Sequence, residues 1–244
     1  MAKPRFYHPH PMRLGDIVTL SDNASAHATR ALRLQLGDSL CLFNGDGHDY
    51  QCVLTRLGKT ASTAEVKLKT FIRKESPLQI TLLQGISSGT RMDYTIQKAT
   101  ELGVTSIQAL ATERSVVKLS AERAEKRLAH WQNIVYSACE QCGRATIPTV
   151  LAPLSLSQWL AKEAGTVSSR LLLNPVGATR LADISHSHQS IALLIGAEGG
   201  LTEAEIRLAS QHGFQSVVLG PRILRTETAA LTAITVMQSL WGDF

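Results

Sequence analysis

Three short segments of the chain place glycine, asparagine or charged residues directly after an apolar run. They are LLLNP (171–175), LLIGAEGGLTEAEI (193–206) and VVLGPRILRTET (217–228). An apolar run that stops at such residues is typical of a buried parallel strand followed by a loop. Open α/β sheets bind ligands at the carboxyl ends of their strands. One such loop alone is explained as an ordinary connection, but three close together in the chain predict a cofactor pocket.

The middle loop is suited to a ligand through its backbone. Gly196, Gly199 and Gly200 carry no Cβ, so the chain can approach a ligand closely there and expose its amides. Thr202 is placed to cap the helix that follows, and Glu205, three residues later, completes a capping box.

The third loop raises a question about charge. Arg222, Arg225 and Glu227 stand at the entrance of a helix that is almost entirely apolar. Charges beside a buried element are costly unless they are paired or used. Glu227 can stabilise the positive end of the helix dipole, and Arg222 can pair with it. A structural use and a chemical use of this loop therefore both stay open.

Several common catalytic signatures are absent from the sequence. GKT at 58–60 resembles the end of a P-loop, but the glycine required upstream is replaced by Val53, and the segment lies between two predicted strands. The GxGxxG and HExxH patterns do not occur, and no serine-hydrolase constellation is evident. A P-loop NTPase, a Rossmann dehydrogenase and a common α/β hydrolase are therefore not expected.

The cysteines and histidines do not indicate a metal or redox site. Cys139 and Cys142 form a CxxC motif, but no second ligand pair stands at a zinc spacing. The motif ends a helical pattern, whereas a redox CxxC begins a helix after a strand. We expect Cys139 and Cys142 to be two small apolar residues on one helix, with reduced thiols and no disulfide. The eight histidines show no spacing typical of metal ligands, so no metal is expected.

The first third of the chain is predicted to be β-rich. Strand-like segments at 39–43, 49–57 and 62–70 are separated by the turn sequences NGDGH and GKTA. A short helix is expected at 23–35. A unit of about 70 residues with this pattern favours a compact barrel.

The pattern changes near 72–77 to apolar strands that alternate with helices. This alternation predicts a parallel sheet covered on both faces, hence an α/β domain. The strands are expected at 78–86, 104–111, 169–173, 191–195 and 216–219, and the helices at 91–103, 120–142, 155–164, 202–212 and 227–240.

The net charge of +5 is distributed unevenly. Residues 1–74 hold 11 of the 25 lysines and arginines but only 6 of the 20 acidic residues, so the rest of the chain is neutral. A solvated surface and a patch that meets a polyanion such as nucleic acid explain this equally well.

No segment approaches the roughly 20 apolar residues of a membrane span, and the N-terminus does not resemble a secretory signal. We therefore expect a soluble cytoplasmic protein.

Six sequence motifs together resemble one enzyme family. They are RFYHP (5–9), HATRALRLQLGD (27–38), IQKATELGV (96–104), ACEQCGR with the following IP (138–148), and the loops LLIGAEGGLTEAEI and LGPRILRTETA. On these motifs the chain resembles the 16S ribosomal RNA uridine-N3 methyltransferases of the SPOUT superfamily, over nearly its whole length. One departure is Ala197, where the family usually has proline; all three glycines and Glu198 are kept.

The resemblance implies a fold, a cofactor and partners. It implies a PUA-like β-barrel for RNA at 1–73 and a SPOUT α/β domain with a trefoil knot at 74–244. S-adenosylmethionine would be the cofactor, 16S ribosomal RNA of the small subunit the substrate, and a homodimer the active form. Another RNA position in the same superfamily, such as a ribose 2′-hydroxyl, and a non-catalytic RNA-binding assembly factor are the alternatives.

The resemblance, with the chemistry of the reaction, also implies site residues. Uridine N3 must lose a proton, so an arginine near the flanking carbonyl oxygens would stabilise the developing anion, and a carboxylate would accept the proton or orient an arginine. The catalytic candidates are Arg225, Glu198 and Glu227. The cofactor-binding candidates are Leu172, Leu173, Asn174, Ile195, Gly196, Gly199, Gly200, Leu219, Gly220, Leu224 and Thr226, the last as the cap of the final helix. The RNA-binding candidates are Arg5, Arg30, Arg33, Arg91, Lys98, Arg144 and Arg222.

Overall fold

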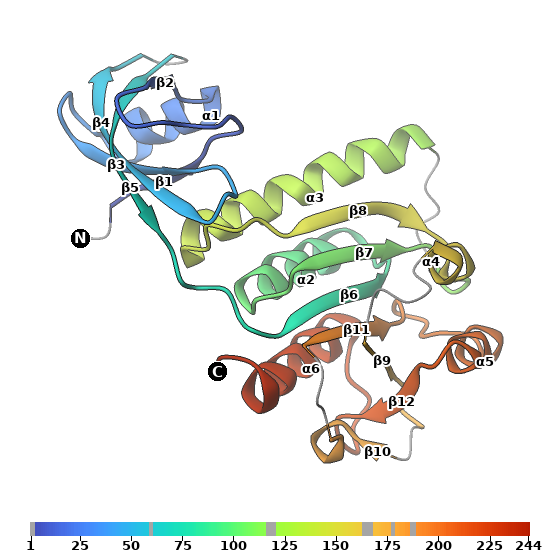
Figure 1. Cartoon of the computed structure of the whole chain (residues 1–244). Coiled ribbons are helices and arrows are strands. Elements are labelled where there is room, and N and C mark those ends of the chain that lie inside the picture. Colours follow the sequence, from blue (N-terminus) through green and yellow to red (C-terminus); the bar gives the residue numbers. More distant parts are fainter. Residues whose placement is uncertain (1–2, 59–60, 116–120, 163–167, 177–178, 186–188) are drawn as a thin grey trace. The chain divides into compact units, whose positions relative to one another are not determined.

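The chain divides into two compact units, which are described separately (Figure 1). The computed structural model describes residues 3–58, 61–115, 121–162, 168–176, 179–185 and 189–244. Unit 1 comprises Met1–Glu75 and Tyr136–Ile147, and unit 2 comprises Ser76–Val135 and Pro148–Phe244. Among the described residues, no helix is long and apolar enough to cross a membrane.

Unit 1 is built on a curled five-stranded sheet with the order β1-β3-β4-β5-β2. Strands β1 and β3 are parallel, and the other neighbours are antiparallel. Alternate residues of the long strands point into one apolar core, which includes Leu40, Tyr50, Leu54 and Val66. The strands are β1 (Arg5–Tyr7), β2 (Ile17–Thr19), β3 (Ser39–Phe43), β4 (His48–Arg56) and β5 (Thr63–Phe71).

The three predicted strands of unit 1 are confirmed as β3, β4 and β5. The edge strands β1 and β2 were not predicted, because three residues are too few to show a period of two. The predicted helix at 23–35 is wrong in its second half. The α-helix α1 (Asp22–Ala26) continues only as a π-helical turn, His27–Ala31, and Arg33 then turns the chain with a left-handed φ of 53°.

Unit 2 is built on a seven-stranded sheet that is parallel throughout, with the order β10-β12-β9-β11-β6-β7-β8. The five predicted strands are confirmed. The two edge strands were not predicted: β8 contains Pro153 and has mostly unburied residues, and β10 has two residues. The strands are β6 (Gln79–Gly85), β7 (Ser106–Leu110), β8 (Thr149–Leu154), β9 (Ser169–Leu173), β10 (Thr179–Arg180), β11 (Ser190–Ile195) and β12 (Gln215–Val218).

All five predicted helices of the second part are confirmed within two or three residues at their ends, as far as the described residues reach; residue 120 of the predicted helix 120–142 and residues 163–164 of the predicted helix 155–164 lie outside them. The long helix α3 begins in unit 2 and ends in unit 1. A 3-10 turn, Leu181–Asp183, follows β10. The helices are α2 (Gly89–Glu101), α3 (Ala121–Cys142), α4 (Leu156–Lys162), α5 (Glu203–Gln211) and α6 (Thr226–Trp241).

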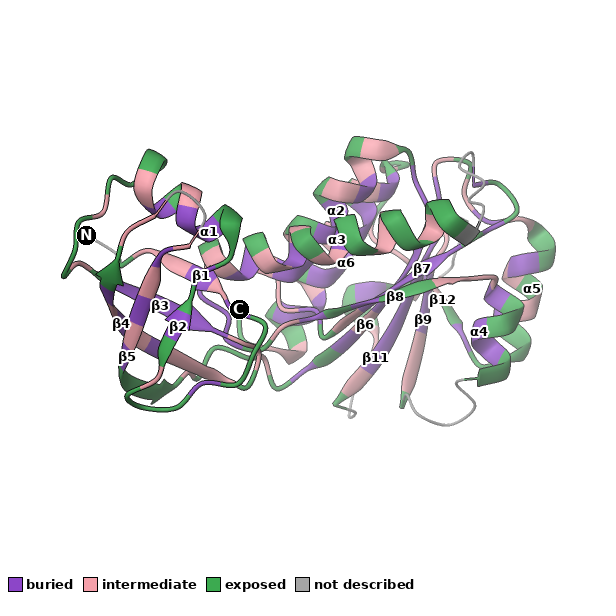
Figure 2. Cartoon of the chain, turned by 90° about the horizontal axis from the view of Figure 1, so that it is seen from above, coloured by how far each residue is buried: buried purple, intermediate pink, exposed green. Residues whose placement is uncertain are grey.

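Most residues of the central strands β6, β7 and β11 of unit 2 are buried (Figure 2). On one face, Leu83, Leu172 and Leu194 pack in a cluster with residues of α4 and α5. The alternate residues, such as Leu82 and Leu193, are equally buried and point the other way. This explains why the strands appear in the sequence as continuous apolar runs.

Helix α6 returns the end of the chain to the middle of the sheet. It packs against α2 and contacts β6 and β11, the two central neighbours. The threading of the chain through its own loop, which the resemblance implies, stays a prediction.

Candidate active site

A cavity of about 690 Å³ lies at the carboxyl ends of β9, β11 and β12. The three loops singled out in the sequence form its wall, because parallel strands bring their carboxyl ends to one edge of the sheet. Of the cofactor-binding candidates only Leu172 is outside; it is fully buried in the cluster beneath α4 and α5. The candidates that line the cavity are Leu173, Asn174, Ile195, Gly196, Gly199, Gly200, Leu219, Gly220, Leu224 and Thr226.

The glycine loop after β11 is a tight turn in which Gly196 and Gly199 leave no room for a side chain, and Gly200 has a left-handed backbone conformation that favours glycine. The amide of Gly200 donates to the Ala197 carbonyl at 2.9 Å, and Gly200 has a φ of 70°. A Cβ on Gly196 would stand 2.6 Å from the carbonyl carbon of Gly200, and one on Gly199 would stand 2.9 Å from the Cβ of Arg114. The loop therefore depends on its glycines for its shape, as well as for exposing its amides.

The predicted capping box at the start of α5 is confirmed. The amide of Glu205 donates to the Thr202 hydroxyl at 3.2 Å, and the Thr202 amide donates to the Glu205 carboxylate at 2.9 Å. The other Glu205 oxygen accepts the amide of Glu113 at 3.0 Å. Arg114 donates to the carbonyls of Gly199 and Leu201, both at 3.2 Å. The segment after β7 thus holds the glycine loop from outside.

Helix α6 begins differently from the prediction. Its N-cap is Arg225, which makes no side-chain capping bond, and Thr226 is the first helical residue. The Thr226 hydroxyl is buried and donates to the Gly196 carbonyl at 2.6 Å, while the amide of Gln84 donates to it at 2.9 Å. Thr226 therefore joins two walls of the cavity instead of capping the helix.

Two carboxylates share one arginine at the cavity. Arg91 donates to Glu198 at 3.2 Å and lies 3.9 Å from Glu227, and the Ser88 amide donates to Glu198 at 2.8 Å. Burial raises the pKa of Glu198, but the hydrogen bonds from Ser88 and Arg91 outweigh it, so the pKa is lowered overall. Among the described residues, the second oxygen of each carboxylate is buried and has no hydrogen-bond donor.

The remaining arginines of the cavity are exposed. Arg222 and Arg225 both line its rim. The possible pairing of Arg222 with Glu227 does not occur among the described residues, where the ion pair of Glu227 is with Arg91. Arg91, which we assigned to RNA contact from the sequence, lies among the catalytic candidates.

Two predicted RNA contacts, Arg5 and Arg144, lie inside unit 1. Arg5 donates to Asp49 at 2.6 Å and to the carbonyl of Cys139. Arg144, with a side chain only 5% exposed, pairs with Glu75. Both guanidinium groups are committed to internal partners, so neither is included in the RNA-binding surface proposed below.

The other RNA-binding candidates lie on the surface or pair locally. Arg30, on the π-helical turn, and Arg33 are exposed. Lys98, on α2, forms an ion pair with Glu101 at 2.7 Å.

The CxxC motif ends α3, as predicted. The Cys139 thiol is buried, and a hydrogen bond with Cys142 together with burial raises its pKa. Within the described residues no group of three or more histidine, cysteine or acidic side chains is arranged to hold a metal ion.

The comparison with known proteins identifies the family. The RNA methyltransferase domain model matches residues 74–238, and the RNA methyltransferase PUA domain model matches residues 20–67. A protein of Buchnera aphidicola, named ribosomal RNA small subunit methyltransferase E, is 33% identical over 240 residues, 98% of this chain and 97% of its own. The chain belongs to the ribosomal RNA small subunit methyltransferase E family.

Two solved structures support the fold at this family level. Methyltransferase E of Neisseria gonorrhoeae, bound to S-adenosylmethionine, is 46% identical with a TM-score of 0.90, and each chain is covered completely. A Legionella pneumophila protein in complex with the same cofactor is 40% identical with a TM-score of 0.95, again over all of both chains.

Two residues that support the site, Gln84 and Arg114, were not predicted from the sequence. Gln84 is the polar residue in the apolar run ITLLQGI, and a polar side chain in a strand covered on both faces needs a buried partner. A polar residue within an apolar strand could therefore have identified Gln84 as a residue with a buried hydrogen-bond partner. Arg114 follows the end of β7 in a short polar segment, ATER, that carries no distinctive pattern.

Proposed function

We propose that the protein methylates N3 of a uridine in 16S ribosomal RNA, using S-adenosylmethionine, and acts as a homodimer in the cytoplasm. The cavity formed by three loops at the strand ends carries this proposal. Its support from relatives is the name that they share and the S-adenosylmethionine bound to two solved members. We further propose residues 1–73 as the RNA-binding domain and 74–244 as the catalytic domain.

The cavity suits this cofactor in size and in the groups that line it. Its volume of about 690 Å³ lies within the range of roughly 300–1,000 Å³ typical of ligand pockets. Leu173, Ile195 and Leu224 offer apolar contacts for an adenine ring. The glycine loop offers amides, and Glu198 and Glu227 offer negative charge to a cationic ligand.

The cofactor, when bound, supplies an electrophilic methyl group. The chain must then position the uracil, remove the N3 proton and stabilise the negative charge that spreads to the uracil carbonyl oxygens. Arg225 is our candidate for stabilising that charge, because it lies at the cavity rim and is not engaged in an ion pair among the described residues. Arg222, also at the rim, is the second candidate.

The two carboxylates have different proposed roles. Glu198 accepts two hydrogen bonds on one oxygen and has a lowered pKa, so it is a weak proton acceptor and serves to position Arg91. Glu227 has only the 3.9 Å ion pair with Arg91 among its described contacts. We therefore propose that Glu227 is the general base that accepts the proton from uridine N3.

RNA binding is proposed for unit 1 and for the rim of the cavity. Arg30 and Arg33 are exposed and lie in the basic first third of the chain, where phosphate contacts favour such side chains. The exposed residues of α6 are proposed as part of the dimer surface.

The experiment is methylation in vitro followed by nucleoside mass spectrometry. The protein is incubated with S-adenosylmethionine and either small subunits or free 16S RNA from a strain that lacks the modification. We expect 3-methyluridine at one position. A 2′-O-methylated nucleoside or another methylated base would indicate a different RNA target. No binding of S-adenosylmethionine at millimolar concentration in calorimetry would favour a non-catalytic RNA-binding factor instead.

A further inference from the structure

A buried chain of hydrogen bonds links β6 to two walls of the cavity. Gln84 is fully buried at the carboxyl end of β6, opposite Ile195 of β11. Its side-chain nitrogen donates to the Thr226 hydroxyl at 2.9 Å, and that hydroxyl donates to the carbonyl of Gly196 at 2.6 Å. Gly196 and Thr226 line the cavity, whereas Gln84 lies behind them.

The direction of these bonds is fixed by the chemistry of the groups. The Gly196 carbonyl can only accept, so the single hydroxyl proton of Thr226 must point to it. The hydroxyl must then accept from Gln84, which requires the amide nitrogen of Gln84, and not its oxygen, to face Thr226. The same nitrogen also donates to the Gly85 carbonyl at 3.1 Å, which holds the amide in this orientation.

The end of β6 also allows the glycine loop to come close. A Cβ on Gly85 would overlap the backbone nitrogen of Ala197, so only glycine admits the loop at this point. Gln84 and Gly85 together therefore determine where the loop after β11 and the first turn of α6 meet. Thr226 is flanked by Arg225 and Glu227, so its position also determines where those two side chains begin.

We propose that Gln84 is a positioning residue for the cofactor pocket, acting through the Thr226 hydroxyl on the Gly196 peptide. This inference rests on the proposed function. Forming the two walls in advance removes an ordering cost that ligand binding would otherwise carry. Loss of the Thr226 hydroxyl leaves the Gly196 carbonyl without this donor, and loss of Gln84 removes the donor that holds the hydroxyl, so in either case the two walls can separate or rearrange.

A matched pair of glutamines tests the proposal. Gln108 is also buried, at 2%, and its side-chain nitrogen donates to the backbone carbonyls of Ala109 and Ala152, but it does not line or support the cavity. We expect Gln84→Leu to raise the Kd for S-adenosylmethionine by about tenfold or more, as the loss of a buried hydrogen bond implies. Gln108→Leu should lower the melting temperature comparably but leave that Kd within about twofold of wild type.

A second pair of variants tests the hydroxyl itself. Thr226→Val keeps the shape and removes the hydroxyl, so its Kd should rise as in Gln84→Leu. Thr226→Ser keeps the hydroxyl, so its Kd should stay close to that of wild type. Calorimetry with S-adenosylmethionine and thermal unfolding of all four variants give both readouts.

The possible results separate the two proposals. Wild-type affinity in both Gln84→Leu and Thr226→Val would overturn the positioning role while leaving the methyltransferase proposal intact. Equal losses of affinity in Gln84→Leu and Gln108→Leu would also overturn it, because the effect would then be general destabilisation. If the wild-type protein bound no S-adenosylmethionine, the proposed function would fail, and the positioning role with it.

Discussion

Arg225 and Arg91 are two cationic side chains of the cavity with different surroundings. Arg91 is held by Glu198 and lies close to Glu227, whereas Arg225 is exposed at the start of α6. Arg91, which already pairs with two carboxylates, can orient them. Arg225, which is exposed at the rim, is available to a substrate. This difference is the basis for separating a positioning arginine from a catalytic one.

Arg225→Ala should lower kcat by about 100- to 1,000-fold, the usual effect of removing one group that stabilises developing negative charge. The Kd for S-adenosylmethionine should change by less than about twofold. Arg207→Ala is the control, since Arg207 is exposed on α5 and pairs only with Glu203 among its described contacts. Turnover equal to that of the control would remove Arg225 from the catalytic residues.

Glu227→Gln should reduce kcat by about 100-fold or more, because an amide cannot accept the N3 proton. Glu203→Gln is the matched change: Glu203 also lines the cavity, but its side chain is 89% exposed. Steady-state turnover at saturating RNA compares the two. If the kcat of Glu227→Gln equalled that of Glu203→Gln, the Glu227 carboxylate would not accept the proton and would only stabilise the helix dipole or pair with Arg91.

At the level of elements, the end of β6 is as much a part of the site as the three loops. Gly85→Ala should destabilise the protein by about 1–3 kcal/mol and abolish S-adenosylmethionine binding, because the added methyl overlaps the backbone of Ala197. Gly89→Ala, in open space at the start of α2, should be neutral or slightly stabilising. Calorimetry and urea unfolding measure both effects. Normal cofactor affinity in Gly85→Ala would show that the loop can move away without loss.

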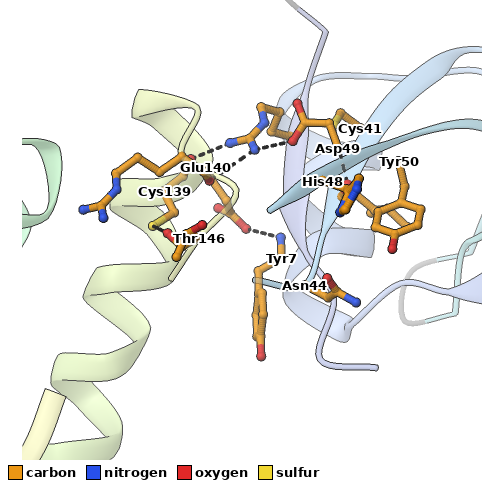
Figure 3. A network of polar contacts seen from close by, with 12 residues as sticks. Tyr7, Cys41, Asn44, His48, Asp49, Tyr50, Cys139, Glu140 and Thr146 are labelled. Atoms are coloured by element: carbon orange, nitrogen blue, oxygen red, sulfur yellow. Dashed lines mark hydrogen bonds and ion pairs between the residues drawn. The ribbon is translucent and has the colours of Figure 1, made fainter. Parts of the chain in front are cut away.

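The junction between β1 and the end of α3 provides a prediction on pH. Burial raises the pKa of Glu140, although the Tyr7 amide, which donates to it at 2.9 Å, acts in the opposite direction (Figure 3). The folded protein therefore holds this proton more tightly than the unfolded chain. Ionisation of Glu140 therefore lowers the free energy of unfolding as pH rises through the raised pKa.

Glu140→Gln keeps the acceptor for Tyr7 and removes the charge. Its free energy of unfolding should exceed that of wild type at pH 8, and the difference should shrink as pH falls toward 4. Urea unfolding across this range is the measurement. Glu122→Gln, on the exposed start of the same helix, should show no such trend. A constant difference at every pH would contradict the assignment.

At the level of the whole molecule, the basic charge of the first third has two uses. Arg144, paired with Glu75, and Arg5, paired with Asp49, hold unit 1 together. Arg30 and Arg33 are exposed and left for RNA. A count of charges along the sequence does not distinguish these uses, because burial depends on residues far apart in the chain.

Arg30→Ala should weaken RNA binding and reduce the slope of log affinity against log salt by about 0.7–0.9. Arg144→Ala should leave that slope unchanged but lower stability by about 1.5–3 kcal/mol, the usual contribution of hydrogen bonds between charged groups, because the partly exposed Glu75 carboxylate loses its partner. Filter binding at several salt concentrations and urea unfolding separate the two. A reduced slope in Arg144→Ala would return that residue to the RNA surface.

The elements were largely predictable from local pattern. Apolar runs gave the central strands, and the capping residues gave the start of α5, because burial on both faces and helix capping depend on neighbours in sequence. The edge strands β1, β2, β8 and β10 were missed, because they are short or exposed and owe their form to pairing with other strands.

The sequence by itself determined the α/β class, the three loops and most residues that line the cavity. Each of these follows from residues adjacent in the chain and from the rule that parallel strands end at one edge of a sheet. Only the tertiary structure decided that Gln84 supports Thr226, that Arg91 joins Glu198 to Glu227, and that Arg5 and Arg144 are internal. The partners in these pairs are far apart in the sequence, from 44 residues for Arg5 and Asp49 to 142 for Gln84 and Thr226. Side chains so distant along the chain meet only when the chain folds.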